Sequence, residues 1–332
     1  MRARSPLIST GRTMIDAVWG WPPPVLDPAG PYADSVTLLA WVLFGLGVFV
    51  SGVVVVALWI AVKGSPGLRA KLGGEHAVWI GGIAFPAVVL VALLVWGLLL
   101  TASLTRPISG EEMRVRVTGE MWWFRVAYLD PAGNTEMLDA NEIHIPVGHP
   151  VVLELESADV IHNFWVPNLS GKMDMIPGRT NLLRIQADRP GQFGGVCAEY
   201  CGGPHALMGF VVIAHEPEAW NQWVAARRAR LQAASSPPAG AAARGRALFM
   251  DEGCAGCHRV AGTQANGLAG PDLTHVGSRA TLGAGILPNH RGTMMGWIGD
   301  SQSIKPGNRM PRYDMLSAEE IEAIAIWLET QR

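Results

Sequence analysis

Two long apolar runs without a charged residue constrain this chain of 332 residues more than any other feature. The first run covers 36–62 and the second covers 77–105. Each is longer than the roughly 20 apolar residues that an α-helix needs to cross a bilayer, whereas helices in a soluble core seldom carry such runs. We therefore expect a transmembrane helical hairpin over 35–106, with a buried hairpin in a soluble protein as the less favoured alternative.

The basic residues near the ends of the runs predict the orientation of the hairpin. The loop between the runs holds Lys63, Arg69 and Lys71, whereas the second run is followed shortly by Arg106 alone. Because short loops rich in Lys and Arg stay in the cytoplasm, we expect this loop inside the cell. Residues 1–34 and the chain after Arg106 then lie outside the cytoplasm. Three arginines among the first twelve residues favour the opposite orientation, but they are far from the first run.

Alternation of apolar and polar residues follows the second run. In 113–117 the apolar residues alternate with Arg114 and Arg116, and a little later Glu154 and Glu156 alternate with apolar neighbours. This period of two is that of a strand with one buried face, so the charged side chains are expected on the opposite face. Further short strands are expected at 143–145, 151–156, 160–166, 182–186 and 210–214. Several short strands separated by Pro- and Gly-containing turns are typical of a Greek-key β-sandwich.

The remaining sequence indicates a helix, a linker and a small helical domain. A helix is expected from Pro217, because Pro and an acidic residue favour the first helical turn. The Ala-, Ser- and Pro-rich segment after it has the composition of a flexible linker. Near the end of the sequence, Ser317 and Glu320 predict a capping box. The expected parts are therefore a sandwich at 107–216, a helix and flexible linker at 217–242, and a small all-α domain at 243–332.

The stretch from Cys197 to Met208 concentrates side chains that bind soft metals. Cys197, Cys201, His205 and Met208 lie within a dozen residues of one another. Zinc sites use Cys and His but seldom a thioether, so Met208 favours copper. A surface disulfide between the two cysteines is the alternative, but a disulfide does not explain why His205 and Met208 lie beside them.

The other two cysteines belong to a second redox motif. Cys254-Ala-Gly-Cys257-His258 is a Cys-x-x-Cys-His sequence, the signature of covalent c-type haem attachment. A zinc site or a thioredoxin-like dithiol is the alternative, but a His directly after the second Cys suits neither. All 4 cysteines of the chain thus fall into two redox motifs, which predicts a protein that transfers electrons.

Together these motifs resemble subunit II of cytochrome c oxidase, in the caa-type form with a fused class I cytochrome c domain. The resemblance covers roughly 35–330 and includes His162 in Asp-Val-Ile-His-Asn-Phe-Trp-Val-Pro. It implies a cupredoxin-like fold for 107–216 and a cytochrome c fold for 243–332. It also implies a binuclear copper centre held by His162, Cys197, the Glu199 backbone carbonyl, Cys201, His205 and Met208. The Glu199 side chain resembles one that binds a Mg or Mn ion at the interface with subunit I, with a solvated acid as the alternative.

For the haem, the resemblance implies thioether bonds to Cys254 and Cys257 and iron ligation by His258 and Met310. Met310 lies in Lys-Pro-Gly-Asn-Arg-Met-Pro, which is similar to the segment that carries the axial Met in class I cytochromes c. Pro271 matches a Pro beside the iron-ligating His of that family. The other candidates for the sixth ligand are Met294, Met295 and Met315, with His275 and His290 for a bis-His haem.

An aromatic segment and one acidic residue match the family less closely. Gly119-Glu-Met-Trp-Trp-Phe-Arg resembles its aromatic motif, in which the first aromatic residue, here Trp122, receives electrons from cytochrome c. An aromatic stripe can equally be core, and the residues flanking Trp122 depart from the family pattern. Near the cytoplasmic end of the second helix, Trp79 replaces the Glu that the family often places at the mouth of a proton pathway. Glu75, one turn earlier, is a substitute for it or an interfacial charge.

The function that the resemblance implies is electron input into a haem-copper terminal oxidase of a bacterial inner membrane. Electrons would pass from a donor to haem c, to the binuclear copper centre, and to haem in subunit I, where O₂ is reduced to water. Expected partners are subunits I and III, membrane lipid, and a cytochrome c or quinol-oxidising donor, while a net charge of -2 without a basic patch argues against nucleic acid. The alternatives are the equivalent subunit of a nitric oxide reductase and, less favoured, a copper-delivery protein. The residues His144, His149, His215, Met173 and Met175 match no motif and are expected at the surface, in strands or in the core.

Overall fold

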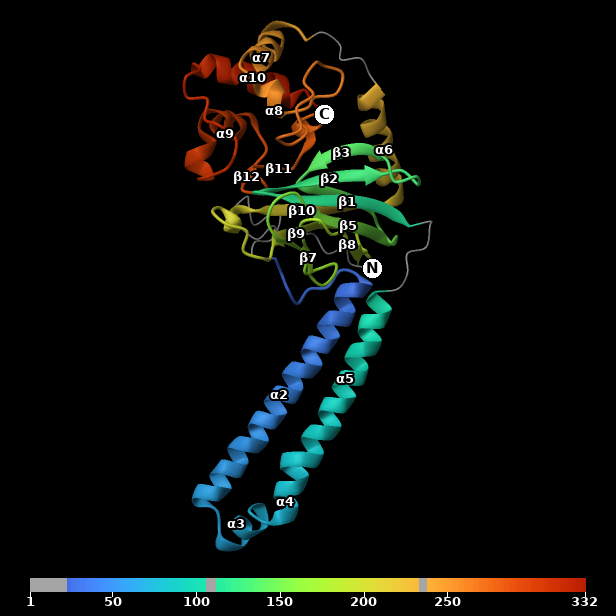
Figure 1. Ribbon diagram of the computed structural model, residues 1–332, viewed down its shortest axis with the longest axis vertical. Helices are drawn as coiled ribbons and strands as arrows, with labels where there is room; N and C mark the ends of the chain where they lie inside the picture. The colour runs from blue at the N-terminus through green and yellow to red at the C-terminus, as the bar shows by residue number, and fades with distance from the viewer. Residues whose placement is uncertain (1–22, 106–111, 233–237) are drawn as a thin grey trace, which may run out of the picture. The chain divides into compact units, whose positions relative to one another are not determined.

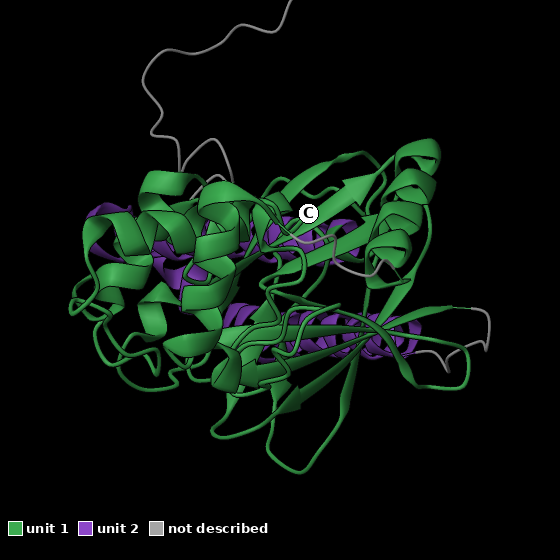
Figure 2. Cartoon of the chain, turned by 90° about the horizontal axis from the view of Figure 1, so that it is seen from above, with its two compact units in different colours: residues 1–33, 109–332 green, residues 34–108 purple. Residues whose placement is uncertain are grey.

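The computed structural model describes residues 23–105, 112–232 and 238–332 (Figure 1). The chain forms two compact units (Figure 2). One unit is residues 34–108, and the other combines residues 1–33 with 109–332. The arginines of the first twelve residues, Arg106 and residues 233–237 of the expected linker lie outside the described residues.

The smaller unit consists of two long apolar helices and a short connection. The first helix is α2 (Pro31–Lys63), and α3 (Pro66–Leu72) follows it. The second helix is built from α4 (Glu75–Trp79), the π-helical η1 (Ile80–Ala84) and α5 (Phe85–Leu104). Both long helices are apolar enough to cross a membrane, and their most hydrophobic stretches are 0% buried within the protein. A helix surface of this kind requires a hydrophobic surrounding, which a bilayer provides.

The π-helical turn in the second helix has a local cause. Pro86 has no N–H to donate and its ring crowds the preceding turn. In η1 the backbone widens, and the Phe85 N–H bonds to the Ile80 carbonyl five residues earlier. Such single π-turns accommodate irregularities inside an α-helix. Glu75 and Trp79 are the first and last residues of α4, so both precede this turn.

The first domain of the larger unit is a sandwich of two five-stranded sheets (Figure 1). The first sheet has the order β3-β2-β1-β5-β8, and the second has the order β4-β10-β9-β6-β7. Each sheet mixes orientations, because β1 pairs parallel with β5 and β10 pairs parallel with β4. The strands are β1 (Met113–Glu120), β2 (Trp123–Leu129), β3 (Thr135–Ala140), β4 (Glu142–Pro146), β5 (Val151–Ser157), β6 (His162–Trp165), β7 (Met173–Met175), β8 (Asn181–Ile185), β9 (Gly191–Cys197) and β10 (Gly209–His215).

Aromatic side chains fill the space between the sheets. Phe124, Phe164 and Phe210 are buried, and the ring centroids of Phe124 and Phe210 lie 4.7 Å apart. Gly195 on β9 is required by this packing, since a Cβ there would collide with the Phe210 ring. Glycine lowers strand propensity, which is why no strand was expected over the residues of β9.

The expected alternation of β5 is present, but the burial of one of its acidic residues was not foreseen. Glu154 is paired in register with Arg116 of β1, and its residue is only 4% exposed. Arg114 and Arg116 on the neighbouring strand β1 both form ion pairs with it, and their side chains cover the carboxylate. The strands β2 and β3 were not expected, because their apolar positions do not alternate regularly, and β7 is only three residues long.

Residues that precede the sandwich in the sequence and residues that follow it also pack against it. Ala29 joins the edge of the sandwich through Ala29 N–H to Asn168 O at 2.7 Å and Asp188 N–H to Ala29 O at 2.8 Å. The expected helix is α6 (Pro217–Gln232), and its Trp220 and Trp223 pack against the sandwich core. These contacts place α6 on the sandwich.

The C-terminal domain is helical, with one short pair of strands that was not expected. Its elements are α7 (Gly240–Asp251), α8 (Cys254–Cys257), η3 (Val276–Ser278), β11 (Thr281–Leu282), β12 (Leu287–Pro288), α9 (Arg291–Ile304) and α10 (Ala318–Glu329). The predicted capping box of Ser317 and Glu320 is present at the start of α10. α7 and α10 cross at Gly245, where a Cβ would collide with the Ala323 carbonyl.

Candidate functional site

The two cysteines of the sandwich meet at the end of β9. Cys197 is the last residue of β9, and the loop after it returns Cys201 to a position where the two Sγ atoms are 3.7 Å apart. The Glu199 carbonyl oxygen lies 3.2 Å from the Cys197 Sγ, while the Glu199 side chain is exposed. Cys197 is 5% exposed and Cys201 is 3% exposed. Both thiols are therefore sheltered from water and close enough to share a ligand.

Two imidazoles and a thioether surround this pair of thiols. The His162 Nδ1 lies 3.9 Å from the Cys197 Sγ, and the His205 Nδ1 lies 3.4 Å from the Cys201 Sγ. The Met208 Sδ is 3.8 Å from the Cys201 Sγ, and the Met208 side chain is buried. His205 begins a short 3₁₀ turn, η2 (His205–Leu207), which brings its ring back towards the thiols. The candidate copper ligands thus form one cluster, which His162 joins from a separate strand.

The orientation of His162 is fixed by its neighbours. Its Nε2 is 2.8 Å from the Asp159 Oδ1, so its Nδ1 faces the thiols. A side chain on Gly119 would lie 2.7 Å from the His162 ring, so only glycine leaves room for the ring there. A carboxylate on the outer nitrogen of an imidazole is the usual arrangement around a metal-binding His.

The two thiols of the cluster differ in how readily they ionise. The pKa of Cys197 is lowered, chiefly because the Cys201 thiol hydrogen-bonds to its thiolate and also because His162 does. The same interaction, together with burial, raises the pKa of Cys201. Burial opposes a charged His162, but Cys197 and Asp159 outweigh it and raise the His162 pKa. A second thiolate beside the first therefore needs a nearby positive charge, which soft metal ions supply. The donor set fits copper.

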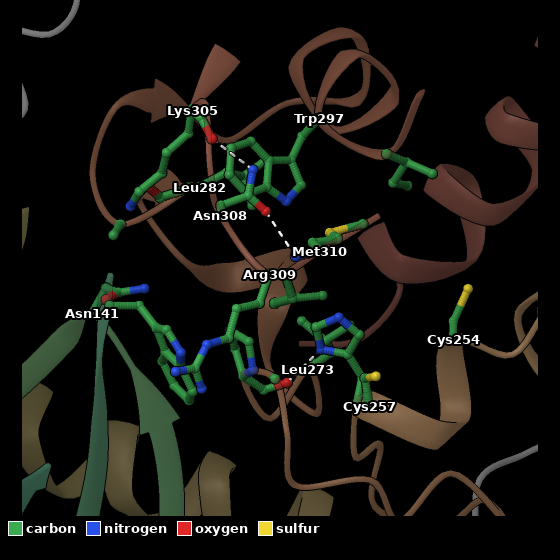
Figure 3. A pocket seen from close by; sticks show the side chains of 18 of the residues that line it. Asn141, Cys254, Cys257, Leu273, Leu282, Trp297, Lys305, Asn308, Arg309 and Met310 are labelled. Carbon is green, nitrogen blue, oxygen red and sulfur yellow. Dashed lines mark hydrogen bonds between the residues drawn. The ribbon is translucent and has the colours of Figure 1, made fainter. Parts of the chain in front are cut away.

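The second site is a cavity of about 320 Å³ that is lined mainly by the C-terminal domain, with Trp122 and Asn141 of the sandwich also among its lining residues (Figure 3). Cys254, Cys257, His258 and Met310 line it, and Figure 3 shows the two cysteines and Met310 around the same space. The His258 Nδ1 lies 2.8 Å from the Pro271 carbonyl, which leaves the Nε2 for the cavity. Burial lowers the pKa of His258 and so favours the neutral imidazole, the form that binds iron. These residues fit a covalently attached haem.

The residues that line the cavity distinguish between the candidates for the sixth iron ligand. Met294 and Met310 both line it, whereas His275 and His290 are not among its lining residues in the described part of the chain. Met315 is 70% exposed. Met310 is held by its backbone, because its N–H donates to the Asn308 Oδ1 and its carbonyl accepts from the side chains of Ser301 and Gln302.

Trp122 touches both sites. It lines the haem cavity, and its indole N–H donates to the Cys201 carbonyl at 2.9 Å. Its ring packs on Gly202 and Gly203, where added Cβ atoms would lie 3.5 and 3.3 Å away. Phe124, by contrast, is core. The structure thus brings Trp122 to both sites and leaves Phe124 in the sandwich.

Several residues at the junction of the two domains were missed by sequence reasoning. The Lys305 Nζ donates to the Trp122 carbonyl at 2.6 Å, and the Arg279 Nε donates to the Asp139 Oδ1 at 2.8 Å. Asp139 is also 3.3 Å from Arg227 of α6. Each pair joins residues that are far apart in the chain, so these contacts cannot be predicted from the spacing of residues in the sequence.

The histidines outside the motifs lie away from the thiol cluster. His144 on β4 and His215 on β10 face each other, with the His144 Nδ1 2.7 Å from the His215 Nε2, and Trp223 of α6 stacks on His144. His149 contacts the Val147 carbonyl, and Met175 is part of the sandwich core. These positions agree with strand and packing roles.

Comparisons with known proteins follow this division of the chain. The family model for the periplasmic domain of cytochrome c oxidase subunit II matches residues 114–215, and the cytochrome c model matches residues 242–332. The cytochrome c oxidase subunit 2 of Alkalihalophilus pseudofirmus is 34% identical over 316 residues, 92% of this chain and 90% of that protein. That of Bacillus subtilis is 28% identical over 331 residues, 92% of this chain and 90% of that protein.

Among solved structures, the periplasmic domain of subunit II of the cytochrome oxidase of Bradyrhizobium japonicum is 28% identical, with a TM-score of 0.32. That match covers 37% of this chain and 97% of that one. The likeness to the Alkalihalophilus protein extends over the apolar helices, the sandwich and the helical domain alike. This chain belongs to the cytochrome c oxidase subunit 2 family.

Proposed function

We propose that this chain is the subunit through which electrons enter a haem-copper terminal oxidase, from a donor to haem c, then to copper, then to haem in subunit I. The observation that carries the proposal is the position of Trp122. It lines the haem cavity with one part and hydrogen-bonds the Cys201 carbonyl with another. A single side chain thus bridges the two redox sites, which gives an electron a short passage between them.

The residues that would hold the cofactors are those of the two clusters. Copper would be bound by His162, Cys197, the Glu199 carbonyl, Cys201, His205 and Met208, and haem c by Cys254, Cys257, His258 and Met310. When bound, a binuclear copper centre and a haem each accept and release one electron with little change in geometry. The protein keeps the sulfur ligands buried, and Asp159 and Pro271 orient the two imidazoles.

The family and the two apolar helices support a membrane protein whose soluble domains lie outside the cytoplasm and which associates with subunit I. We extend this to a two-span hairpin in a bacterial inner membrane with its short loop in the cytoplasm, and to subunit III as a further neighbour. The exposed Glu199 side chain would serve a Mg or Mn ion at the subunit I interface, and Glu75 would serve a proton pathway. The donor would be a cytochrome c or a quinol-oxidising complex.

The alternatives lack comparable support. Both relatives described above are named cytochrome c oxidase subunit 2, and neither points to a nitric oxide reductase. A copper-delivery protein would need neither a haem-binding cavity nor a tryptophan that joins it to the copper ligands.

Electron paramagnetic resonance of the full-length chain, purified with its partner subunit, tests the proposal. Hyperfine structure from two equivalent coppers, together with one haem bound through thioethers by mass spectrometry, is the expected result. The matched variant is Cys197→Ser, which should lose the copper signal and keep the haem, because the two sites share no ligand. A spectrum from single copper ions, or a chain without haem, would overturn the proposal.

A further inference from the structure

Lys305 lies at the junction of the haem-binding and copper-binding domains. It follows α9 directly, and its residue is only 3% exposed. Its Nζ donates to the Trp122 carbonyl at 2.6 Å and to the Gly283 carbonyl at 3.1 Å. One of these acceptors belongs to the copper-binding domain and the other to the haem-binding domain. The ammonium group therefore joins the two domains at Trp122.

The surroundings of Lys305 are costly for a cation. No ion pair to its ammonium group is found among the described residues, and both hydrogen-bond partners are neutral carbonyls. Burial lowers the pKa of Lys305 to about 7, with the Cys201 charge acting in the opposite direction. A buried charge that lacks a charged partner destabilises a protein, and an apolar side chain of similar size would fill the space at lower cost. Core packing alone does not explain a lysine here.

Lys305 is also the middle of a continuous series of hydrogen bonds. The Met310 N–H donates to the Asn308 Oδ1 at 2.8 Å, and the Asn308 Nδ2 donates to the Lys305 carbonyl at 2.8 Å (Figure 3). The Lys305 Nζ then donates to the Trp122 carbonyl, and the Trp122 indole donates to the Cys201 carbonyl. The series runs from the candidate haem ligand to a candidate copper ligand.

We propose that Lys305 is a positioning residue for electron transfer between the two domains. Its two hydrogen bonds hold the Trp122 backbone against the haem-binding domain, while the indole is held by Cys201 of the copper-binding domain. The step itself moves one electron, and no proton is transferred and no bond is formed or broken. The proposal rests on the proposed function, because it assigns Lys305 a part in electron transfer between the haem and copper sites.

The test compares Lys305→Met with Lys172→Met in the full-length chain within its complex. Met keeps the length and apolar stem of Lys305 but removes its donors, and Lys172 is an exposed lysine of the copper-binding domain. Haem c is reduced by a light flash, and the arrival of the electron at copper is followed by absorbance. The rate should fall by on the order of 10-fold in Lys305→Met, because misplacement by a fraction of an ångström to 1 Å slows reactions strongly. It should be unchanged in Lys172→Met.

Equilibrium measurements distinguish positioning from a general structural role. Copper content, haem content and both reduction potentials should stay as in the unmodified protein. Amide hydrogen exchange should rise in residues 119–125 and stay unchanged in residues 276–279, where the contact of Arg279 with Asp139 does not involve Lys305. Lys305→Arg, which retains donors, should restore protection of 119–125 and recover part of the rate.

Two results would overturn the proposal. One is an unchanged transfer rate in Lys305→Met, and the other is a slow rate accompanied by lost cofactor or by faster exchange throughout the junction. Failure of the proposed function itself looks different, because the unmodified protein would then bind no copper pair or would pass no electron from haem to copper.

Discussion

Two of the three imidazoles that we propose as metal ligands, those of His162 and His258, are held through their other ring nitrogen. Asp159 holds the Nε2 of His162, and the Pro271 carbonyl holds the Nδ1 of His258. These contacts select the tautomer and the direction of the free nitrogen. Asp159 has two further contacts. Its carboxylate accepts a hydrogen bond from the Met121 N–H at 2.8 Å and lies 3.4 Å from the Arg309 guanidinium group. The carboxylate therefore orders the proposed copper ligand His162 and the segment next to Trp122 together.

We expect Asp159→Asn to weaken copper binding by about 10- to 100-fold, as is typical when an outer partner of a metal-binding His is removed. The amide keeps the shape but loses the charge that favours a ligating imidazole. Competition with a copper chelator measures the change. Asp188→Asn, an exposed site on the same domain, is the control and should bind as before. Equal affinities for all three proteins would show that Asp159 has no such role.

The two candidate ligand methionines that line the haem cavity give a second test at this scale. Met310→Leu should lower the reduction potential of the haem, because a thioether ligand raises it, and should abolish the weak sulfur-to-iron absorption band. Met294→Leu removes the other candidate and should keep both properties. A redox titration and an absorption spectrum decide the matter, and the reverse pattern would identify Met294 as the ligand.

Among the elements, the crossing of α7 and α10 builds the frame of the haem-binding domain. The helices approach so closely at Gly245 that a Cβ would collide with the Ala323 carbonyl. Phe249 and Trp327 pack beside the crossing with their ring centroids 4.9 Å apart. Glycine is weakly helix-forming, so its presence inside α7 follows from this contact.

Gly245→Ala should therefore destabilise the haem-binding domain by about 1–3 kcal/mol, the usual effect of overfilling a packed site. Gly296→Ala is the matched control, because nothing lies within 4 Å of a Cβ built there in α9. That substitution should stabilise by roughly 0.5–1 kcal/mol, since alanine has the higher helix propensity. Denaturant unfolding followed through haem absorbance measures both, and a neutral Gly245→Ala would contradict the close crossing.

At the scale of the whole soluble unit, buried ion pairs fix the haem-binding domain on the copper-binding domain. Asp139 on β3 is 2% exposed and pairs with Arg279 of the haem-binding domain and Arg227 of α6. Burial alone would raise the pKa of Asp139, but the two arginines outweigh it and lower the pKa to about 2. The carboxylate is therefore charged throughout the neutral range and binds three segments together.

Asp139→Asn should cost about 3–5 kcal/mol of stability, because it leaves two buried guanidinium groups without a counter-charge. Glu136→Gln is the comparison, since Glu136 pairs with Arg228 between the same two elements but at the surface. Its loss should cost at most about 1 kcal/mol. Denaturant titration gives both values, and similar losses for the two variants would exclude a special role for the buried pair.

The same junction should make stability depend on pH. Burial lowers the pKa of His275 to about 3, and burial together with the nearby charges of His144 and Arg227 lowers the pKa of His215 to about 4. Above pH 6.5 both histidines are neutral whether the chain is folded or not, so their full contribution to the free energy of unfolding is present there. As the pH falls from about 6.5 towards these lowered values, the unfolded chain takes up protons that the folded chain does not.

The free energy of unfolding should therefore decrease between pH 7 and pH 5. His275→Gln removes one of the two groups and should reduce the difference between the two pH values. The comparison is made by denaturant unfolding at both pH values. A difference as large in the variant as in the unmodified protein would show that His275 does not contribute.

How much of the molecule could be predicted depends on the range of the interactions. The α10 capping box and the two apolar helices follow from neighbours within a turn or from uninterrupted apolar runs. β9 could not be predicted, because Gly195 within it is selected by the Phe210 ring on another strand and not by strand propensity. The burial of Glu154 could not be predicted, because the arginines that cover it lie on a different strand.

By itself, the sequence determined which side chains can bind metal and haem, since Cys197 to Met208 and Cys254 to His258 are short segments whose chemistry is set by the residues they contain. Only the tertiary structure decided how these sites meet. The contacts of Lys305 with Trp122 and of Arg279 with Asp139 join residues more than a hundred positions apart. No local pattern encodes such contacts, because they arise only when separately folded parts of the chain bury a common surface.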